Sequence, residues 1–310
     1  MSAKIKRRLT SLPRWVRTLT TIFIVGLSFI YLGYNVIYGL KQIDLAHLKP
    51  HPTPLILAML LYTSGVLIGG LCWSLIMKGL GQELPLRTNM RVHLSANIVK
   101  YLPGYAWQIL GKAYLCNRHG IPAELIGIGI ALEFLSIVLT GLWTAVLTLP
   151  TARLETWGLA KFSTWRWPGI VLLSVLIIAI PRLLKGMIRY WGTRGRSVRQ
   201  LQIDQKSLWL MLLLMILAWF ILGVTLYVLS KALYPIAFAE LPSLTFAWAA
   251  SSILSLAVVF VPTGLGVREG ALTFFLASHL PMALAAIVAI LARVISILSE
   301  VLCFWAAQRL

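Results

Sequence analysis

Two interrupted apolar stretches of the sequence combine cations with helix-breaking residues. The first contains Lys100-Tyr-Leu-Pro-Gly104, and the second contains Pro262-Thr-Gly-Leu-Gly-Val-Arg-Glu-Gly270. Proline removes a backbone donor and glycine permits a sharp reversal, so each motif frees backbone amides and carbonyls. A helix that restarts after Gly264 or Gly266 directs its N-terminal amides at the adjacent space, which suits a phosphate group. The two motifs therefore predict a site for a phosphate-bearing headgroup.

Charged residues near these motifs complete the predicted site. Arg268 lies in the first turn of the restarting helix and adds a cation, and Glu269 can pair with Arg268 or with a cationic headgroup. The alternative interpretation is that proline and glycine kink helices, while the charges anchor helix ends at the bilayer interface. The predicted substrate-binding residues are Lys100, Pro103, Gly104, Lys112, Glu133, Pro262, Gly264, Gly266, Arg268, Glu269, Arg293 and Glu300.

Three of these residues lie inside strongly apolar segments. Glu133 and Arg293 each lie near the middle of a segment, at equivalent depths when the sequence is shifted by 160 residues. Glu300 is seven residues beyond Arg293, which places both on one helix face. An ionisable group at the bilayer centre costs about 2.5–3.5 kcal/mol on insertion scales, so it normally faces a partner or a cavity. A buried ion pair and a polar lining of the site both remain open.

The elements that position these residues must be membrane helices. Hydrophobic residues make up 59% of the 310 residues and charged residues 12%, against about 45–50% and 25% in soluble domains. Lipid must therefore surround most of the chain, and open strands cannot satisfy their backbone groups there. The sequence predicts an all-α integral membrane protein. It excludes a soluble enzyme, a disordered chain and a secreted disulfide scaffold.

Six apolar runs are long enough to cross a bilayer. They are Leu19–Leu40, Leu55–Met77, Glu124–Leu149, Pro168–Ile188, Ser207–Leu233 and Met282–Ala307. The first is expected to stay uncleaved, because no small-residue cleavage site follows it. The interrupted stretches Thr88–Leu115 and Ser243–Leu280 are predicted as re-entrant helical hairpins. Tryptophans at span ends, including Trp73, Trp165 and Trp167, predict interface belts.

The charge distribution predicts orientation and partners. The sequence has 28 Lys and Arg residues but only 9 Asp and Glu residues. Of the 28 basic residues, 19 lie in the N-terminal segment and in residues 78–118 and 182–206. The predicted topology places these segments on one side, which the positive-inside rule makes cytoplasmic. We expect a cell (inner or plasma) membrane location with both termini in the cytoplasm. Anionic lipid headgroups are the expected partner of this basic face, and nucleic acid is not, since no polar module could read it.

An internal repeat organises the chain as one transmembrane domain, 1–310. A shift of 159 residues brings Pro103 onto Pro262 and Pro122 onto Pro281. Repeat 1 covers about 55–149 and repeat 2 about 207–308, with a basic cytoplasmic loop at about 182–206. Because their corresponding spans run in opposite directions, the repeats are predicted to be inverted. Secondary transporters use inverted repeats with broken helices to build a site near the bilayer midplane.

Three motifs carry a resemblance to a known family. Asn97-Ile-Val-Lys-Tyr-Leu-Pro-Gly104, Gly111-Lys-Ala-Tyr-Leu115 and Pro262-Thr-Gly-Leu-Gly-Val-Arg-Glu-Gly-Ala271 resemble the flippase-like membrane region of lysylphosphatidylglycerol synthases (multiple peptide resistance factor). The resemblance covers nearly the whole chain and implies that a phospholipid moves between leaflets. We expect a stand-alone member without the soluble aminoacyl-transferase domain, because the chain stops after its last span. Stand-alone members also occur beside glycolipid and polysaccharide functions, so the lipid stays open.

The leading hypothesis is a non-enzymatic translocator that moves an anionic or zwitterionic phospholipid or lipid-linked headgroup between the repeats. No Walker-type loop is present, so ATP is not expected to drive it directly. The alternatives are an integral-membrane transferase acting on a polyprenyl-phosphate or phospholipid, and a small-solute secondary transporter. The scattered acids, without an Asp-x-Asp or His/Asp cluster, disfavour the transferase. No metal or cofactor is predicted, and further candidate partners are a second copy of the chain and envelope-biosynthesis enzymes.

Overall fold

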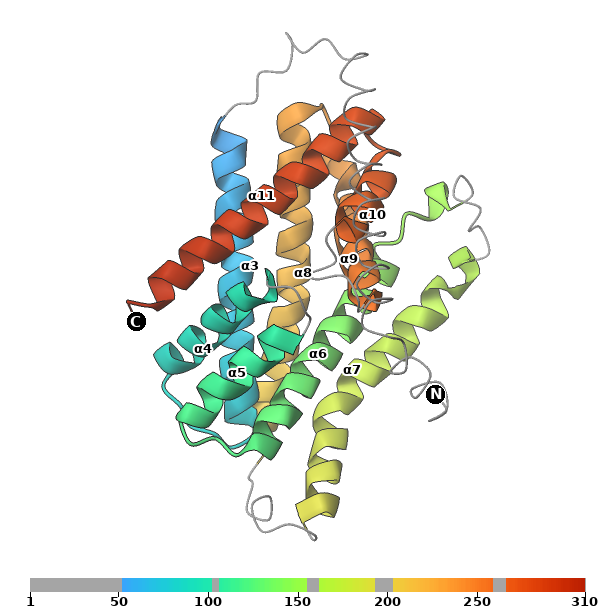
Figure 1. Ribbon diagram of the computed structural model, residues 1–310. Coiled ribbons are helices and arrows are strands. Elements are labelled where there is room, and N and C mark those ends of the chain that lie inside the picture. Colours follow the sequence, from blue (N-terminus) through green and yellow to red (C-terminus); the bar gives the residue numbers. More distant parts are fainter. Residues whose placement is uncertain (1–51, 102–105, 155–161, 193–202, 259–265, 310) are drawn as a thin grey trace, which may run out of the picture.

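The computed structural model describes residues 52–101, 106–154, 162–192, 203–258 and 266–309 (Figure 1). Every regular element in these ranges is a helix. The predicted all-α fold of a multi-pass membrane protein is therefore confirmed. The predicted first span, Leu19–Leu40, lies outside the described residues, as do residues 193–202 of the predicted basic loop. Residues 182–192 of that loop are not a loop but continue helix α7, which ends at Gly192.

Five described helices are long and apolar enough to cross a membrane. They are α3 (Pro52–Gly79), α6 (Ala123–Leu147), α7 (Phe162–Gly192), α8 (Gln205–Leu233) and α11 (Met282–Ala307). Each coincides with a predicted span, and most ends differ by only a few residues. In α7 the prediction began too late, because the helix continues through Pro168 as well as Pro181.

Each interrupted stretch forms a pair of shorter helices. These are α4 (Leu86–Ile98) and α5 (Ala106–Arg118) in the first half, and α9 (Leu241–Ala257) and α10 (Val267–Leu276) in the second, with short 3-10 turns η2 (Val99–Tyr101), η3 (Thr151–Arg153) and η4 (Phe238–Glu240). Gln108 Nε2 donates to Asn97 Oδ1 at 3.2 Å, and Lys112 lies 3.3 Å from His93 further along the same helices. The α4–α5 pair is therefore antiparallel. The predicted tips at 103–104 and 262–265 lie outside the described residues.

Local sequence explains where several helices begin. Pro122 and Pro281 precede α6 and α11 with nearly the same backbone conformation, ψ 139° in both, which proline's fixed φ and missing donor favour at a helix start. Asp204 caps α8 by accepting from the backbone amides of Lys206 and Ser207. Gly266 precedes α10 with φ 79°, a left-handed conformation that favours glycine.

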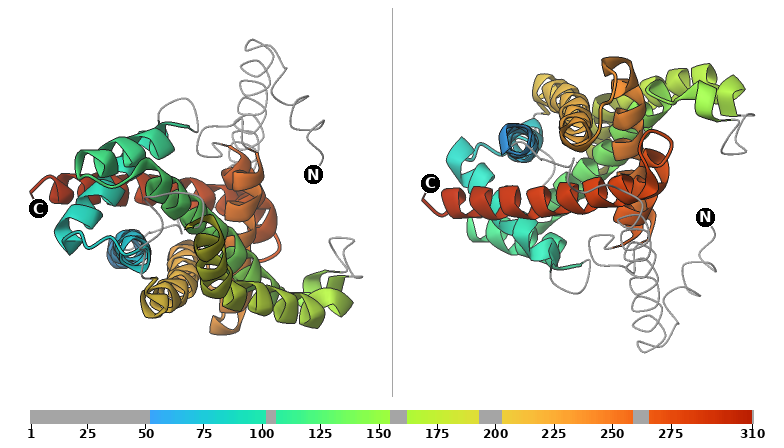
Figure 2. Two further views of the ribbon diagram at one scale, coloured as in Figure 1. Left: turned by 90° about the horizontal axis from the view of Figure 1, so that it is seen from below. Right: turned by 90° about the horizontal axis from the view of Figure 1, so that it is seen from above.

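Helices α3 and α8 form an antiparallel pair along the length of the bundle, side by side in Figures 1 and 2. A Cβ placed on Gly65 would lie 3.3 Å from Leu222, and one on Gly79 would contact Leu208 at 2.5 Å. From Gly65 to Gly79 the contacts move toward the C-terminus of α3. From Leu222 to Leu208 they move by the same number of residues toward the N-terminus of α8. The first helices of the two halves thus run in opposite directions.

The contacts of the first half recur in the second half with the corresponding helices exchanged. Helix α4 packs on α11 of the other half, and α9 packs on α6 in the same way; α3 contacts α11, and α8 contacts α6. Within the halves, the matching pairs are α3–α4 with α8–α9, α4–α5 with α9–α10, α5–α6 with α10–α11, and α3–α6 with α8–α11. This is the packing expected of two halves related by a two-fold axis across the bundle.

Glycines allow equivalent close approaches in both halves. A Cβ on Gly70 of α3 would lie 2.6 Å from Met90 Sδ of α4, and one on Gly223 of α8 would clash with Thr245 of α9.

The three cysteines are buried and free. Large apolar side chains, such as Leu213 and Val171, instead cover the outer surface, as a lipid-facing surface requires.

Candidate functional site

A buried triad of His93, Lys112 and Glu133 lies among α4, α5 and α6. Lys112 Nζ donates to both carboxylate oxygens of Glu133, at 2.6 and 2.8 Å, and its side chain is only 3% exposed. His93 Nδ1 lies 3.3 Å from Glu133 Oε1 and 3.3 Å from Lys112 Nζ. The ammonium also lies 4.0 Å from the centre of the Trp73 ring on α3. These contacts compensate the loss of water around two buried charges.

A second ion pair joins the two halves. Lys100 Nζ, in the turn η2 of the first half, donates to Glu300 Oε1 of α11 at 2.6 Å. The Tyr62 hydroxyl of α3 donates to the same oxygen at 3.2 Å. Glu300 is almost fully buried, whereas a quarter of the Lys100 side chain is exposed. The pair therefore has one end in the core and one end accessible from outside it.

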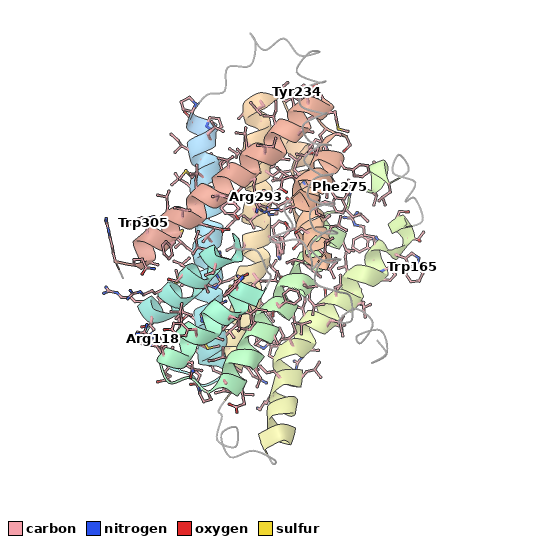
Figure 3. All side chains as sticks on the ribbon, in the orientation of Figure 1. Arg118, Trp165, Tyr234, Phe275, Arg293 and Trp305 are labelled. Carbon is pink, nitrogen blue, oxygen red and sulfur yellow. The ribbon has the colours of Figure 1, made fainter. Side chains whose placement is uncertain are left out.

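A third ion pair lies within the second half. Arg293 Nη1 of α11 lies 3.6 Å from Glu269 Oε1 of α10. The other carboxylate oxygen of Glu269 accepts from the Gly266 backbone amide at 2.7 Å. Glu269 thus caps α10 and anchors α11 with one side chain. In Figure 3, Arg293 lies midway along the bundle.

Arg268 is the remaining cation of this region. Its guanidinium lies 4.4 Å from the centre of the Trp248 ring on α9, and the Trp248 and Tyr62 rings meet edge to face at 6.0 Å. Among the described residues no carboxylate forms an ion pair with Arg268. Lys100, Lys112, Arg268 and Arg293 thus outnumber the three carboxylates by one positive charge.

These groups form one electrostatic unit, which we call the central network. The charge of Lys100 acts on His93, and those of Arg268 and Arg293 act on both Tyr62 and Lys100. The central network consists of Tyr62, His93, Lys100, Lys112, Glu133, Trp248, Arg268, Glu269, Arg293 and Glu300. It draws on both halves, and its excess positive charge makes it complementary to an anion.

Eight predicted site residues are described, and seven of them belong to the central network: Lys100, Lys112, Glu133, Arg268, Glu269, Arg293 and Glu300. The eighth, Gly266, adjoins the network through its backbone amide, which donates to Glu269. Pro103, Gly104, Pro262 and Gly264 lie outside the described residues.

Three details of the sequence interpretation are corrected. Glu269 does not pair with Arg268 but with Arg293, because α11 crosses α10 at that level. The Gly266 amide is not offered to a ligand, since the Glu269 carboxylate accepts its hydrogen bond. Trp73 is not an interface residue: it is fully buried beneath Lys112.

Sequence reasoning missed four members or neighbours of the site: Tyr62, Trp73, His93 and Trp248. Tyr62 and Trp248 lie in ordinary apolar runs, where aromatic residues fill cores and carry no distinctive signal. His93 did carry one, since it interrupts an apolar segment between Val92 and Leu94. Its pairing with Glu133 depends on how α4 and α6 each pack against α3 and α5, which local sequence does not specify.

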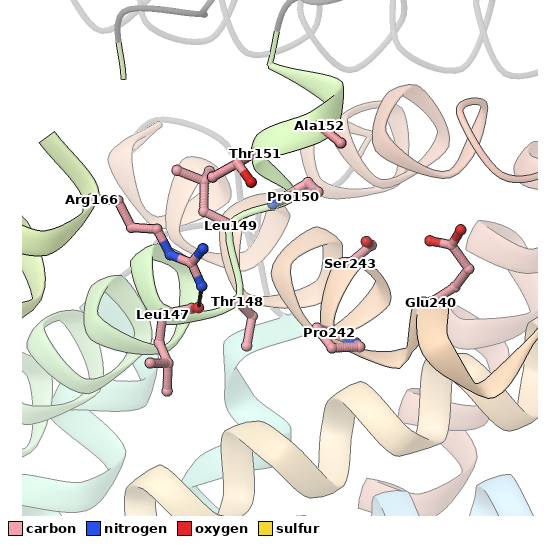
Figure 4. A pocket seen from close by; sticks show the side chains of 10 residues that line it. All are labelled: Leu147, Thr148, Leu149, Pro150, Thr151, Ala152, Arg166, Glu240, Pro242 and Ser243. Carbon is pink, nitrogen blue, oxygen red and sulfur yellow. Dashed lines mark hydrogen bonds between the residues drawn. The ribbon is translucent and has the colours of Figure 1, made fainter. Parts of the chain in front are cut away.

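One pocket of the described residues lies away from the central network, where α6 ends and where α7 and α9 begin (Figure 4). Its volume is about 720 Å³. The lining residues are Leu147, Thr148, Leu149, Pro150, Thr151, Ala152, Arg166, Glu240, Pro242 and Ser243. Arg166 and Glu240 carry opposite charges on opposite sides of this pocket.

Comparison with known proteins gives one family. The family model described as lysylphosphatidylglycerol synthase TM region matches residues 19–302, nearly the whole chain. A comparison with curated proteins gave no match.

Proposed function

The chain belongs to the lysylphosphatidylglycerol synthase TM region family, and from that premise we propose that it translocates a phospholipid or lipid-linked substrate between membrane leaflets. The headgroup is anionic or zwitterionic and passes between the halves at the central network, while the acyl chains stay in lipid. This role needs no chemical step by the protein, so we propose a translocator rather than an enzyme.

The observation that carries the proposal is the charge balance of the central network. Three of its cations each lie next to a carboxylate, whereas Arg268 rests on the Trp248 ring. A cation held over an aromatic ring keeps its charge and presents its remaining donors, which is how a guanidinium recognises phosphate. Arg268 is therefore proposed as the first phosphate contact.

The neighbouring Lys100–Glu300 pair can open so that the headgroup passes. If Lys100 leaves Glu300 for a lipid phosphate, the Tyr62 hydroxyl still donates to that carboxylate. Breaking the Lys100–Glu300 pair also releases a contact between the two halves. We propose that headgroup binding and separation of the halves are coupled at this pair.

The repeated, inverted packing of the helices supports alternating exposure of such a site to the two leaflets. The basic segments would gather anionic lipid at a cytoplasmic face, with both termini on that side of the cell membrane. A homo-oligomer or contacts with envelope-biosynthesis enzymes are compatible with this role.

The test is leaflet exchange in reconstituted vesicles. Vesicles of phosphatidylcholine and phosphatidylglycerol carry a trace of headgroup-labelled fluorescent phospholipid, and dithionite bleaches only the outer-leaflet label. We expect the full chain to raise the bleached fraction above the half that protein-free vesicles lose. If bleaching equals that of protein-free vesicles under every lipid composition tried, the proposal fails.

A further inference from the structure

The pocket between α6, α7 and α9 has the features of a second headgroup site, distinct from the central network. Four apolar residues, Leu147, Leu149, Pro150 and Pro242, form part of its wall, and hydroxyl residues lie around it. Its volume of about 720 Å³ falls in the range of small-molecule sites, about 300–1,000 Å³. The pocket can therefore accommodate a whole phospholipid headgroup.

Arg166 is fixed at one side without losing its charge. One Nη2 hydrogen bond, 2.7 Å long, goes to the Leu147 carbonyl at the end of α6, and the guanidinium lies 5.6 Å from the Trp167 ring centre. Its Nε is buried and donates to no described group. A guanidinium has five N–H donors, so several remain for a phosphate. No described carboxylate pairs with Arg166.

Glu240 lies on the other side of the pocket. Its Oε2 is 3.2 Å from His279 Nδ1, while about a third of the side chain stays exposed. A carboxylate accepts about four hydrogen bonds, so Glu240 can accept from an ammonium group in addition to its protein partners. Both residues line the pocket, and Figure 4 shows them on opposite sides of it.

The depth of the pocket favours lipid over a soluble ligand. Trp165 and Trp167 flank Arg166 and are 68% and 67% exposed. Exposed tryptophans at the end of a spanning helix mark the level of the lipid headgroups. The α6 span ends at Leu147 and the α7 span begins at Ser163 at this end of the bundle.

We propose that this pocket binds the zwitterionic headgroup of a phospholipid, with its phosphate on Arg166 and its ammonium on Glu240. A pocket with one cation and one carboxylate on opposite sides matches a phosphate joined to an amine better than it matches a purely anionic headgroup. The inference goes beyond the proposed function, because a lipid can bind here whether or not it is translocated.

The experiment measures binding without transport. The full chain in dodecylmaltoside is titrated with diheptanoyl phosphatidylethanolamine, diheptanoyl phosphatidylglycerol or glycerophosphoethanolamine, and the melting temperature is recorded. A ligand of the folded state raises the melting temperature with its concentration. We expect the zwitterionic lipid to act at a concentration at least about tenfold lower than either alternative.

Substitutions test whether Arg166 binds the phosphate and Glu240 the ammonium of the headgroup. Arg166→Gln and Glu240→Gln should each raise the apparent dissociation constant of the zwitterionic lipid at least about tenfold, the loss of about one charge-assisted hydrogen bond. Arg118→Gln and Glu124→Gln, at exposed positions, are the matched controls and should leave it unchanged. Arg166→Lys tests whether a loss reflects the charge or the fold, since it keeps the cation.

Each other outcome overturns the proposal. Equal effects of the two lipids, with no effect of Glu240→Gln, would make the pocket a site for anions alone. Equal potency of glycerophosphoethanolamine would make the ligand a soluble compound. No concentration-dependent shift with any of the three would remove the site, while leaflet exchange, measured separately, would still decide the proposed function.

Discussion

Lys100 Nζ lies 2.6 Å from Glu300 Oε1, and this contact connects the first half of the chain to α11 of the second half. The two residues are 200 positions apart in the sequence. The pair couples the energetics of the halves, so its disruption should affect both stability and any motion between them.

The first prediction concerns this pair. Lys100→Met should lower the free energy of unfolding by about 3 kcal/mol, because it removes the cation that lies against the buried Glu300 carboxylate. Glu300→Gln in the same chain should restore part of that loss, since the uncompensated charge is gone. Unfolding in mixed SDS micelles measures the free energy of unfolding of the single and the double variant. Lys185→Met, at an exposed position, is the control. Strictly additive effects of the two substitutions would contradict the coupling.

The second prediction concerns recognition of phosphate by Arg268. Arg268→Gln should slow leaflet exchange of the labelled phospholipid at least about tenfold, the size of one lost charge-assisted contact. Its melting temperature should change little, since a cation–π contact contributes about 0.5–2 kcal/mol. Arg118→Gln is the matched control, because Arg118 also lies over an aromatic ring, that of Tyr114, but at an exposed site. Unchanged exchange in Arg268→Gln would show that the site is assigned wrongly.

The third prediction concerns the close approach of α8 and α9. Gly223→Leu should destabilise the protein by about 1–3 kcal/mol, because the new side chain would overlap Thr245 and force the helices apart. Gly127→Leu on α6 meets open space, so it should be neutral or slightly stabilising through helix propensity. Thermal melting of both variants in one detergent makes the comparison. Similar melting temperatures would mean that α9 moves away from α8 without cost.

The fourth prediction concerns pH and the start of α8. Hydrogen bonds from the Ser207 hydroxyl and from the backbone amides of Ser207 and Lys206 lower the pKa of Asp204. A lowered pKa in the folded state means that the cap stabilises fully above the unfolded pKa of about 3.9 and is lost as pH falls through the folded value. Asp204→Ala should therefore cost about 1 kcal/mol at pH 7, with the difference from wild type shrinking below about pH 4.

Asp204→Asn separates the cap from its charge. Asparagine also accepts the cap hydrogen bonds but does not titrate, so its stability should lack the acid-dependent loss attributed to Asp204. Melting temperatures at pH 3 and pH 7 give the comparison. An Asp204→Ala difference that is the same at both pH values would show that the carboxylate charge does not matter.

Much of the fold could be predicted from runs of apolar residues, because lipid requires every backbone group in a span to be bonded within a helix. Helix α11 begins and ends at the predicted residues, Met282 and Ala307. Pro122 and Pro281 indicate where the helices that follow them begin. The continuation of α7 through Pro168 could not be predicted, since proline is tolerated at some helix positions and breaks others.

The candidate site could be predicted by residue but not by partner. Lys112 and Glu133 were both expected to matter, and their contact at 2.6 Å results from α5 packing against α6. Periodicity indicates which face of a helix is polar, but it does not give the crossing that selects a partner. For the same reason, the sequence predicted Arg268 or a cationic headgroup as the partner of Glu269, whereas the structure pairs Glu269 with Arg293.

The packing of the helices is repeated across the two halves, but the charges are not. At the 159-residue offset, Lys112 corresponds to Ala271, while Arg268 and Glu269 correspond to Ile109 and Leu110. If the halves exchange their shapes, the surroundings of the Lys112–Glu133 pair change in the first half and those of the Glu269–Arg293 pair change in the second. These two rearrangements differ in electrostatic cost. We therefore expect the protein without substrate to favour one conformation, in which the site is open to one particular side of the bilayer.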